Sequence, residues 1–308
     1  MRADAVIARL PSEVGLLAVA EARKAARPFA IEVAGCGWDS LWNHGNWQGK
    51  VYAPVMTLRM KLAVAESAHS LYVTREFLQR RYPCRQGNTV SCSNVEIPAP
   101  DRHVLERRLE RMANRTDSPV VLGLIGTLRT RYKGIQTVME ALSRVRAELP
   151  PVIFRVLGGG DAGPWKEEAA KFGVDDLVVF DGTRPVGEPV LQWLDEVDLY
   201  LQPSFQEGLP RALIEAMSRA CPALASTCAG IPELLEGDCL VRPGDAKSLG
   251  QLLVESVNNR EWQFRQSQRN WSEAAHYSRD VLEKRRFDFL AAFAAEAAAQ
   301  GRLELSTG

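Results

Sequence analysis

DLYLQPSFQEGLPRALIEAM, residues 198–217, decides the fold of the second half of this chain. It opens with an apolar run of strand length, passes through a polar loop containing Gly and Pro, and continues with apolar residues at helical spacing. A strand that leads directly into a helix is the unit from which parallel α/β sheets are built. The same alternation extends over residues 116–275 and predicts a doubly wound parallel sheet there.

Apolar runs and helical spacing give the expected elements of both halves. In the second half we expect strands at 120–125, 152–157, 177–180, 198–201, 223–226 and 239–241. The helices between them are expected at 135–145, 164–171, 190–194, 210–219, near 232 and at 246–257. The first half predicts a thinner sheet, with strands at 4–8, 29–33, 70–73 and 88–91. A helix is expected at 13–26, an amphipathic helix or a hinge at 101–115, and a last helix of the chain at 279–298.

The composition describes a globular protein with enough residues for two domains. Of 308 residues, 46% are hydrophobic and 25% charged. Lys plus Arg and Asp plus Glu both number 38, which excludes a simple polycationic nucleic-acid binder. No apolar run reaches the roughly 20 residues of a membrane span, and the apolar stretch 14–20 lies between two glutamates, so no signal peptide is expected.

Cysteine and histidine usage argues against a structural metal. The six cysteines contain no C-x-x-C pair, and the four histidines are scattered. We therefore expect reduced thiols in a cytoplasmic protein.

The charges are unevenly distributed between the halves. Residues 1–115 carry 17 basic and 11 acidic side chains, a net of +6, and the remainder is correspondingly acidic. The basic excess includes Arg75, Arg80, Arg81, Arg85, Arg107, Arg108, Arg111 and Arg115. Two interpretations stay open: a surface that docks on anionic lipid, or an ordinary solvated face.

Two carboxylates mark the loop and helix of the quoted stretch. Glu207 and Glu215 stand eight positions apart, about 12 Å if both were helical. A glycosidase needs its carboxylates roughly 5–9.5 Å apart, so this spacing better suits one elongated ligand held at two points. The backbone N–H groups of Gly208, Leu209 and Arg211 would lie at the start of the helix, where phosphate binds well.

A structural interpretation of the same residues is equally open. Pro210 suits the first position of a helix. Arg211, Glu215 and Arg219 follow one another at intervals of four and could form an exposed salt-bridge stripe. Glu207 could complement the helix dipole.

A second cluster, GTLRTRYKG at residues 126–134, joins an expected strand to an expected helix. Arg129, Arg131 and Lys133 could neutralise a diphosphate at the carboxyl edge of the sheet, with Lys133 best placed, or they could belong to a solvated loop. The glycines at 158–160 permit a close backbone approach but lack the G-x-G-x-x-G spacing of a dinucleotide fingerprint.

Together, five stretches resemble the C-terminal lobe of retaining GT-B glycosyltransferases of the family-4 type. They are GTLRTRYKG (126–134), LGGGDAGP (157–164), VVFDG (178–182), DLYLQPSFQEGLPRALIEAM (198–217) and AGIPELL (229–235). The resemblance covers about residues 116–298 and includes the family's E-x7-E spacing. It implies an α/β GT-B fold of two Rossmann-like lobes with parallel sheets.

The resemblance also implies roles for individual residues. Lys133 would bind the donor diphosphate, with Arg129 as a substitute for a family arginine that Thr127 replaces. Glu207 would lie near the transferred sugar, as the catalytic carboxylate, and Glu215 would hold the ribose. The remaining donor-binding residues would be Gly182 and Thr183 near the base, and Gly208, Leu209 and Arg211 near the phosphates. Ala220 and Ala229 replace glycines that are common in the family, and their methyl groups would crowd the backbone.

The first half matches the family less well. The opening ADAVIARLPS resembles a strand from the middle of the family's first lobe, so we expect an incomplete N-terminal lobe. The expected domains are a partial acceptor-side lobe at 1–115, a nucleotide-sugar lobe at 116–275 and a crossover helix and tail at 276–308. Within GCGWDSLWNHGNWQGK (35–50), Trp38 and Asp39 are acceptor-side candidates, although Trp38 and Trp42 could simply pack together.

The expected function is retaining glycosyl transfer from a nucleotide diphosphate sugar to a hydroxyl of a glycan or lipid-linked acceptor, in cell-surface polysaccharide synthesis. No D-x-D motif is present, and the resemblance to GT-B enzymes implies that no cofactor or bound metal is needed. The expected location is cytoplasmic, peripheral at the inner face of the membrane. The main alternative is an inactive nucleotide-sugar-binding fragment or partner subunit. A nicotinamide-dependent oxidoreductase is a third, less supported by the residues because the fingerprint is missing.

Overall fold

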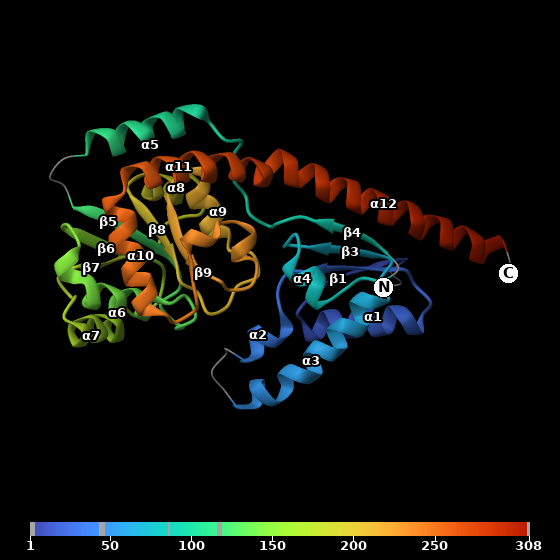
Figure 1. The fold of residues 1–308 in the computed structure, drawn as a ribbon. Coiled ribbons are helices and arrows are strands. Elements are labelled where there is room, and N and C mark those ends of the chain that lie inside the picture. Colours follow the sequence, from blue (N-terminus) through green and yellow to red (C-terminus); the bar gives the residue numbers. More distant parts are fainter. Residues whose placement is uncertain (1–3, 43–46, 86, 116–118, 307–308) are drawn as a thin grey trace. The chain divides into compact units, whose positions relative to one another are not determined.

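The computed structural model describes residues 4–42, 47–85, 87–115 and 119–306, and the side chains up to residue 300. The chain forms two compact units (Figure 1). The first comprises Met1–Asn94, Gln206–Leu209 and Asp280–Gly308, and the second comprises Val95–Phe205 and Pro210–Arg279. The unit boundaries therefore fall after residues 94 and 279, whereas the sequence suggested 115 and 275.

The first unit is built on a four-stranded sheet in which every pairing is parallel. The strand order is β1-β2-β3-β4. The strands are β1 (Val6–Leu10), β2 (Phe29–Val33), β3 (His69–Tyr72) and β4 (Asn88–Ser91). The thin parallel sheet expected from the sequence is confirmed, with strand limits shifted by at most two residues.

Five helices among the described residues belong wholly or mainly to this unit. They are α1 (Glu13–Lys24), α2 (Gly37–Trp42), α3 (Trp47–Ala65), α4 (Phe77–Arg81) and α12 (Arg279–Ser306). Helix α1 begins where the Oγ of Ser12 accepts a hydrogen bond from the backbone N–H of Gly15, a favourable N-cap. The sequence predicted α1 and α12 but neither α2, α3 nor α4.

Helix α12 completes the first unit from the far end of the chain. The His69 ring is buried edge-on against Phe289 and Phe293 of α12. Its Nε2 lies 2.7 Å from a carboxylate oxygen of Glu296. The thiol of Cys92 donates to the carbonyl of Leu282. The core of the first unit therefore includes residues from both ends of the sequence.

The second unit contains a six-stranded sheet of order β10-β9-β8-β5-β6-β7, again parallel throughout. The strands are β5 (Val120–Ile125), β6 (Val152–Leu157), β7 (Val178–Gly182), β8 (Leu199–Gln202), β9 (Ala223–Ser226) and β10 (Leu240–Val241). The chain builds outward from β5 in one direction and from β8 in the other. This reversal between β5 and β8 is the switch point of a doubly wound sheet, as the sequence predicted.

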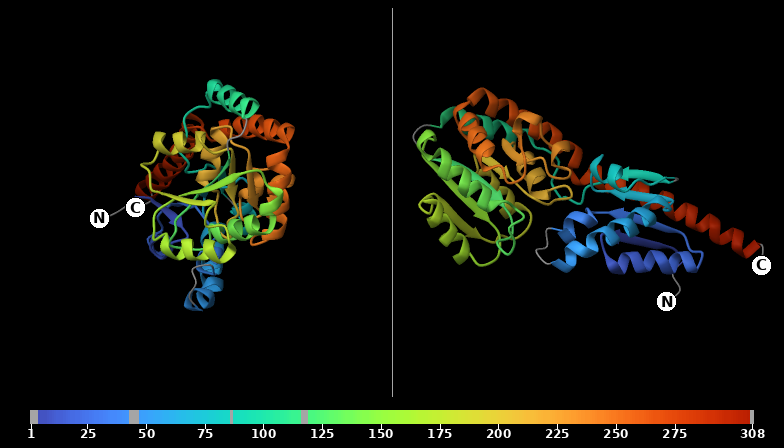
Figure 2. Two further views of the ribbon diagram at one scale, coloured as in Figure 1. Left: turned by 90° about the vertical axis from the view of Figure 1, so that its left-hand side faces the viewer. Right: turned by 60° about the horizontal axis from the view of Figure 1, so that its bottom comes forward.

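Helices lie on both faces of this sheet (Figure 2). They are α5 (Arg102–Asn114), α6 (Ile135–Val145), α7 (Gly163–Phe172), α8 (Glu188–Asp195), α9 (Arg211–Ser218), α10 (Ala246–Asn258) and α11 (Arg260–Ala274). Helix α6 contacts α7 and α10, whereas α9 contacts α8 and α11, and α11 contacts α5. Short 3-10 turns at Arg146–Glu148, Ile231–Glu233, Gly237–Cys239 and Ala275–Tyr277 complete the unit. Among these helices, only α11 was not expected from the sequence.

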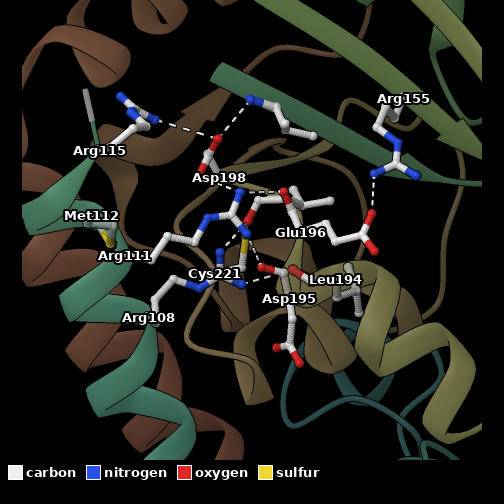
Figure 3. A network of polar contacts seen from close by, with 12 residues as sticks. Arg108, Arg111, Met112, Arg115, Arg155, Leu194, Asp195, Glu196, Asp198 and Cys221 are labelled. Atoms are coloured by element: carbon white, nitrogen blue, oxygen red, sulfur yellow. Dashed lines mark hydrogen bonds and ion pairs between the residues drawn. The ribbon is translucent and has the colours of Figure 1, made fainter. Parts of the chain in front are cut away.

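Helix α5 is held on the second unit by three arginines, which we call the arginine clasp: Arg108, Arg111 and Arg115 (Figure 3). Arg108 is 4% exposed and donates to the carbonyls of Leu194, Val197 and Arg219, at or just beyond the C-terminal ends of α8 and α9. Free carbonyls at helix ends attract cations.

Arg111 and Arg115 of the clasp share a nearly buried carboxylate. They lie 3.0 Å and 3.6 Å from the Asp198 oxygens, and Asp198 also accepts from the backbone N–H of Val121. Arg108 is therefore buried away from any lipid-docking face, while Arg111 and Arg115 are engaged in ion pairs within the second unit. Arg107, on the same helix, is exposed.

Three alanines among the described residues, Ala26, Ala220 and Ala229, have backbone conformations that favour glycine, and the last two lie in the second unit. Ala220 has φ of 53° and Ala229 has φ of 50°, both in the left-handed region. Ala220 follows the C-cap of α9, and its N–H bonds to the carbonyl of Met217. Ala220 and Ala229 are the positions where the resemblance led us to expect glycine. Because alanine has a Cβ, a positive φ strains the backbone at both residues.

All six cysteines are free thiols in the structure, five of them buried. Burial raises the pKa of Cys221 to about 11, which keeps this thiol protonated and unreactive at neutral pH.

Candidate functional site

The switch point of the second sheet brings together two of the loops that the sequence singled out. Loop 126–134 follows β5, and the loop that begins at Pro203 follows β8, the neighbouring strand on the other side of the reversal. The backbone N–H of Phe205 donates to the carbonyl of Tyr132 at 2.7 Å. In an open α/β sheet, ligands bind outside the carboxyl ends of the strands at this point. The candidate site of the second unit therefore lies here.

Gly134 allows the two loops to meet. Its φ is 79°, and a Cβ built on it would lie 2.1 Å from the carbonyl oxygen of Pro203. Any other residue would combine an unfavourable backbone conformation with a backbone clash. Because helix α6 starts at the next residue, Gly134 fixes the start of α6 against the end of β8.

The three cations of the β5–α6 loop differ in their surroundings. Arg131 makes a bidentate ion pair with Glu168 of α7, with N–O distances of 2.6 and 2.7 Å, and lies over the Trp165 ring. This hydrogen bonding lowers the pKa of the Glu168 carboxyl and raises that of Arg131. Arg131 is thus committed to α7, while Arg129 is exposed.

Lys133 is directed by its neighbours. Its aliphatic stem packs on Gly126, where a Cβ would lie 2.7 Å from the Lys133 Cγ. Its Nζ lies 5.3 Å from the centre of the Tyr132 ring. Gly126 therefore supplies the space that lets this stem run close to the end of β5, the edge where the sequence predicted a phosphate-binding lysine.

The ends of β6 and β7 join the same edge of the sheet. The N–H of Gly158 donates to the carbonyl of Gly182, and a Cβ on Gly158 would lie 1.8 Å from the carbonyl oxygen of Gly126. A Cβ on Gly159 would lie 3.0 Å from the Thr183 methyl. The structure thus brings Gly182 and Thr183 to the edge that carries loop 126–134, as the sequence predicted.

A buried hydrogen-bond network of polar side chains, which the sequence analysis missed, supports the end of β8. The hydroxyl of Tyr200 donates to Gln202, the Gln202 amide donates to the Ser204 hydroxyl at 2.7 Å, and the Ser226 hydroxyl donates to the Ser204 carbonyl. All four residues are fully buried. Polar residues at the end of an otherwise apolar strand are the sequence signal that could have revealed this network. It positions the loop that leads to Glu207.

Glu215 lies in the interior of α9 and is half-buried. Desolvation raises the pKa of its carboxyl above the usual value, and the nearby Arg211 guanidinium partly opposes this. The salt-bridge stripe is not formed as expected, because Arg219 pairs instead with Asp195 of α8 at 2.6 and 2.7 Å. The helix also starts one residue later than expected, with Pro210 as its N-cap and Arg211 as its first residue.

The other residues of the E-x7-E stretch lie before α9. Glu207, Gly208 and Leu209 belong to the segment Gln206–Leu209, which groups with the first unit. Glu207 and Gly208 are half-buried, and Leu209 is buried. Their approach to a ligand of the second unit stays a prediction.

The acceptor-side candidates lie on α2 of the first unit. Trp38 stacks on Trp42, with ring centroids 5.1 Å apart, so the two indoles pack together as the structural interpretation proposed. Asp39 lies 3.7 Å from the Arg81 guanidinium. An acceptor contact through either residue stays a prediction.

Comparison with known proteins shows which family and which relatives this chain is similar to. Residues 119–259 match the family described as Glycosyl transferases group 1. The chain is 29% identical to protein CapJ of Staphylococcus aureus over 263 residues, which cover 85% of this chain and 64% of CapJ. It is 33% identical to the colanic acid biosynthesis glycosyltransferase WcaL of Escherichia coli over 138 residues, 41% of this chain and 33% of WcaL.

A solved structure shows the same fold. HepE of Anabaena, in complex with UDP, superposes with a TM-score of 0.69 at 17% identity, covering 93% of this chain and 78% of HepE. The two units and their parallel sheets therefore define a GT-B glycosyltransferase fold, as the sequence predicted. Residues 119–259 of this chain are a Glycosyl transferases group 1 domain. The chain spans 64% of the length of CapJ and a third of the length of WcaL.

Proposed function

We propose that this chain acts in the transfer of a sugar from a nucleotide diphosphate sugar to a hydroxyl acceptor, with retention of the anomeric configuration. The observation that carries the proposal is that loop 126–134, the residues after β6 and β7, and the end of β8 lie along one edge of the sheet that includes the switch point. A nucleotide sugar, which has a base, a ribose, a diphosphate and a sugar, is long enough to contact such a set of loops together.

The donor would lie along this edge in an extended form. Gly182 and Thr183 would be near the base, and Glu215 would accept hydrogen bonds from the ribose hydroxyls. The raised pKa of Glu215 fits a carboxylate that lacks full solvation in the unliganded protein and gains donors when the ribose binds. Lys133 and Arg129 would contact the diphosphate.

Catalysis would be mainly electrostatic. Negative charge grows on the diphosphate as the bond to the sugar breaks, and fixed cations and N–H donors stabilise that charge more in the transition state than in the ground state. Lys133 would provide the cation and the N–H groups of Gly208, Leu209 and Arg211 the donors. Glu207 would position the sugar and stabilise positive charge at its anomeric carbon. That the reaction needs no metal is part of the proposal.

The relatives support the donor class and the biological setting. HepE has been solved with UDP and with UDP-glucose, so a uridine nucleotide is the first donor to test. WcaL is named for colanic acid biosynthesis, which is in keeping with a glycan or lipid-linked acceptor in cell-surface polysaccharide synthesis. A cytoplasmic location is part of the same proposal.

Thermal unfolding with UDP, GDP, ADP and CMP tests donor binding. A nucleotide at 100 times its Kd stabilises a protein by about 2.7 kcal/mol. For a unit of this size, such stabilisation raises Tm by about 5–10 °C. We expect one diphosphate to give this shift in the wild type and most of it to be lost in Glu215→Gln and Lys133→Met. Lys166→Met, on the exposed surface of α7, is the matched control.

The results separate the alternatives. No shift with any nucleotide, or equal shifts in all variants, would remove the proposed donor site. A selective shift without hydrolysis or transfer of the matching nucleotide sugar would identify the inactive binding protein. If transfer occurs, NMR of the product's anomeric proton distinguishes retention from inversion.

A further inference from the structure

Helix α3 carries large apolar side chains on its exposed face. Their exposed fractions are high: Trp47 72%, Val51 67%, Val55 47%, Leu58 59% and Leu62 51%. At 100° per residue these five side chains fall within a sector about 80° wide that runs for about 22 Å along the helix. We call this set the α3 stripe. A continuous exposed apolar strip of this kind marks an interaction surface.

The stripe is not needed to hold α3 in place, because the opposite face does that. Ala53, Met56 and Met60 are buried, with Met56 and Met60 packed over Gly37 of α2, where a Cβ would lie 2.9 and 2.5 Å from them. The helix is therefore apolar on both sides, and one side faces the core of the first unit. The side chains of the stripe take no part in this packing and are exposed.

The charges on α3 indicate the chemistry of a partner for the stripe. The helix has three cations, Lys50, Arg59 and Lys61, and no acidic residue. Lys50 and Lys61 are exposed and border the stripe about 40–60° to one side of Trp47. Arg59, on the other side, is paired with Glu13 of α1 at 2.7 Å.

Two acidic residues near α3, Glu13 and Glu66, are paired with residues other than these lysines. Glu13 accepts from both Arg59 and the Tyr52 hydroxyl. Glu66, just beyond the end of α3, pairs with Arg23 of α1 at 2.9 Å. The surface formed by the stripe and its two lysines is thus apolar in the middle and positive along one border.

We propose that the α3 stripe docks this protein on the surface of an anionic lipid bilayer. An apolar face with basic residues at its border matches the acyl chains and anionic headgroups of such a surface. Trp47 lies at one end of the stripe, and indole rings favour the headgroup level of membranes. None of the helices in the described residues is both long and apolar enough to cross a bilayer, so α3 would lie flat in the interface.

This surface differs from the one suggested by the arginine-rich segments. The arginine clasp is engaged within the second unit, and Arg80 and Arg81 pair with Glu76 and Asp39. The stripe combines large exposed apolar side chains with charge, whereas those arginine-rich segments carry charge without large exposed apolar side chains. The proposal does not depend on donor binding.

Flotation of the full chain with vesicles tests the proposal. We expect the protein to float with phosphatidylcholine vesicles containing 30% phosphatidylglycerol and only weakly with phosphatidylcholine alone. Leu58→Gln combined with Leu62→Gln should weaken binding about a hundredfold, roughly tenfold for each lost apolar contact. Lys50→Gln combined with Lys61→Gln should weaken binding to the anionic vesicles about thirtyfold.

Matched controls lie on the second unit. Val186→Gln removes an apolar side chain that is 87% exposed, and Lys166→Gln with Lys171→Gln removes two exposed cations of α7. Both controls should float like the wild type. Circular dichroism verifies that every variant is folded.

Three results would overturn the proposal. The first is unchanged flotation of the Leu58/Leu62 variant, and the second is equal loss in the control variants. The third is a wild type that does not float but forms a dimer in light scattering, where the Leu58/Leu62 variant is a monomer. That result would assign the stripe to a second copy of this chain. Because nucleotide-dependent thermal shifts report on the second unit, they separate failure here from failure of the proposed activity.

Discussion

Replacing Arg108 by methionine removes the buried centre of the arginine clasp. Methionine keeps most of the apolar stem but none of the donors. Three carbonyls, those of Leu194, Val197 and Arg219, lose a charged partner at once. A buried acceptor left without a donor costs about 1–3 kcal/mol.

The loss is smaller than the simple sum, because the guanidinium no longer has to be desolvated. Three unsatisfied carbonyls at about 1–3 kcal/mol each would sum to about 3–9 kcal/mol, and we expect Arg108→Met to fall in the lower part of that range, at about 3–5 kcal/mol. In a unit of 150–250 residues each kcal/mol lowers Tm by about 2–4 °C. The melting transition of the second unit should therefore fall by about 6–20 °C.

Differential scanning calorimetry of the full chain measures this change. The matched control is Arg107→Met, one residue away on the same helix but exposed. Exposed substitutions of this kind usually stay within about 0.5 kcal/mol of the wild type. If Arg108→Met unfolds at the same temperature as Arg107→Met, the three carbonyl contacts do not hold α5 on the second unit, and our account of the clasp is refuted.

Two further variants test single features of α9. Ala220→Gly should raise the free energy of unfolding of the second unit by about 0.5–1 kcal/mol in urea unfolding, since the relief of left-handed strain exceeds the entropy cost of glycine. Ala216→Gly, inside the helix, should instead lower it. If both variants change the free energy of unfolding in the same direction, the backbone of Ala220 is not strained. Because the folded-state pKa of Glu215 is raised above its usual 4.5, the wild type loses stability as the pH rises through and above that value. Glu215→Gln should therefore be more stable than the wild type at pH 7–8 and approach it below pH 4.5 in urea unfolding, and a gap independent of pH would contradict the shift.

The strands of the second unit could be predicted from the sequence because strands covered on both faces are continuous apolar runs. Helix α11 could not, because the face it buries is polar. Gln263, Gln266 and Asn270 are nearly or fully buried, and the Asn270 amide donates to the carbonyl of Cys221. A search for apolar periodicity passes over such a helix. Helix α3 was missed for the opposite reason, since apolar residues on both of its faces hide the helical period.

The candidate site was predictable in its loops but not in its support. Glycines and cations between a strand and a helix identify loop 126–134 from the sequence. Arg131 and Lys133 have different surroundings because Arg131 pairs with Glu168, which is 37 positions from it in the sequence. Likewise, Arg108 looks like one charge among several in the sequence. Only the carbonyls that face it distinguish it from exposed Arg107.

The route of the chain through the two units has a consequence for synthesis. Apart from Gln206–Leu209, the second unit is inserted into the first: the chain leaves after Asn94 and returns at Asp280, and Ile97 pairs with Ser278 where the two crossings meet. A ribosome therefore completes the inserted unit before it supplies α12. The first strands made must wait, with the surface around His69 uncovered, until Phe289 and Phe293 emerge. The half of the protein that is begun first is thus the half that is finished last.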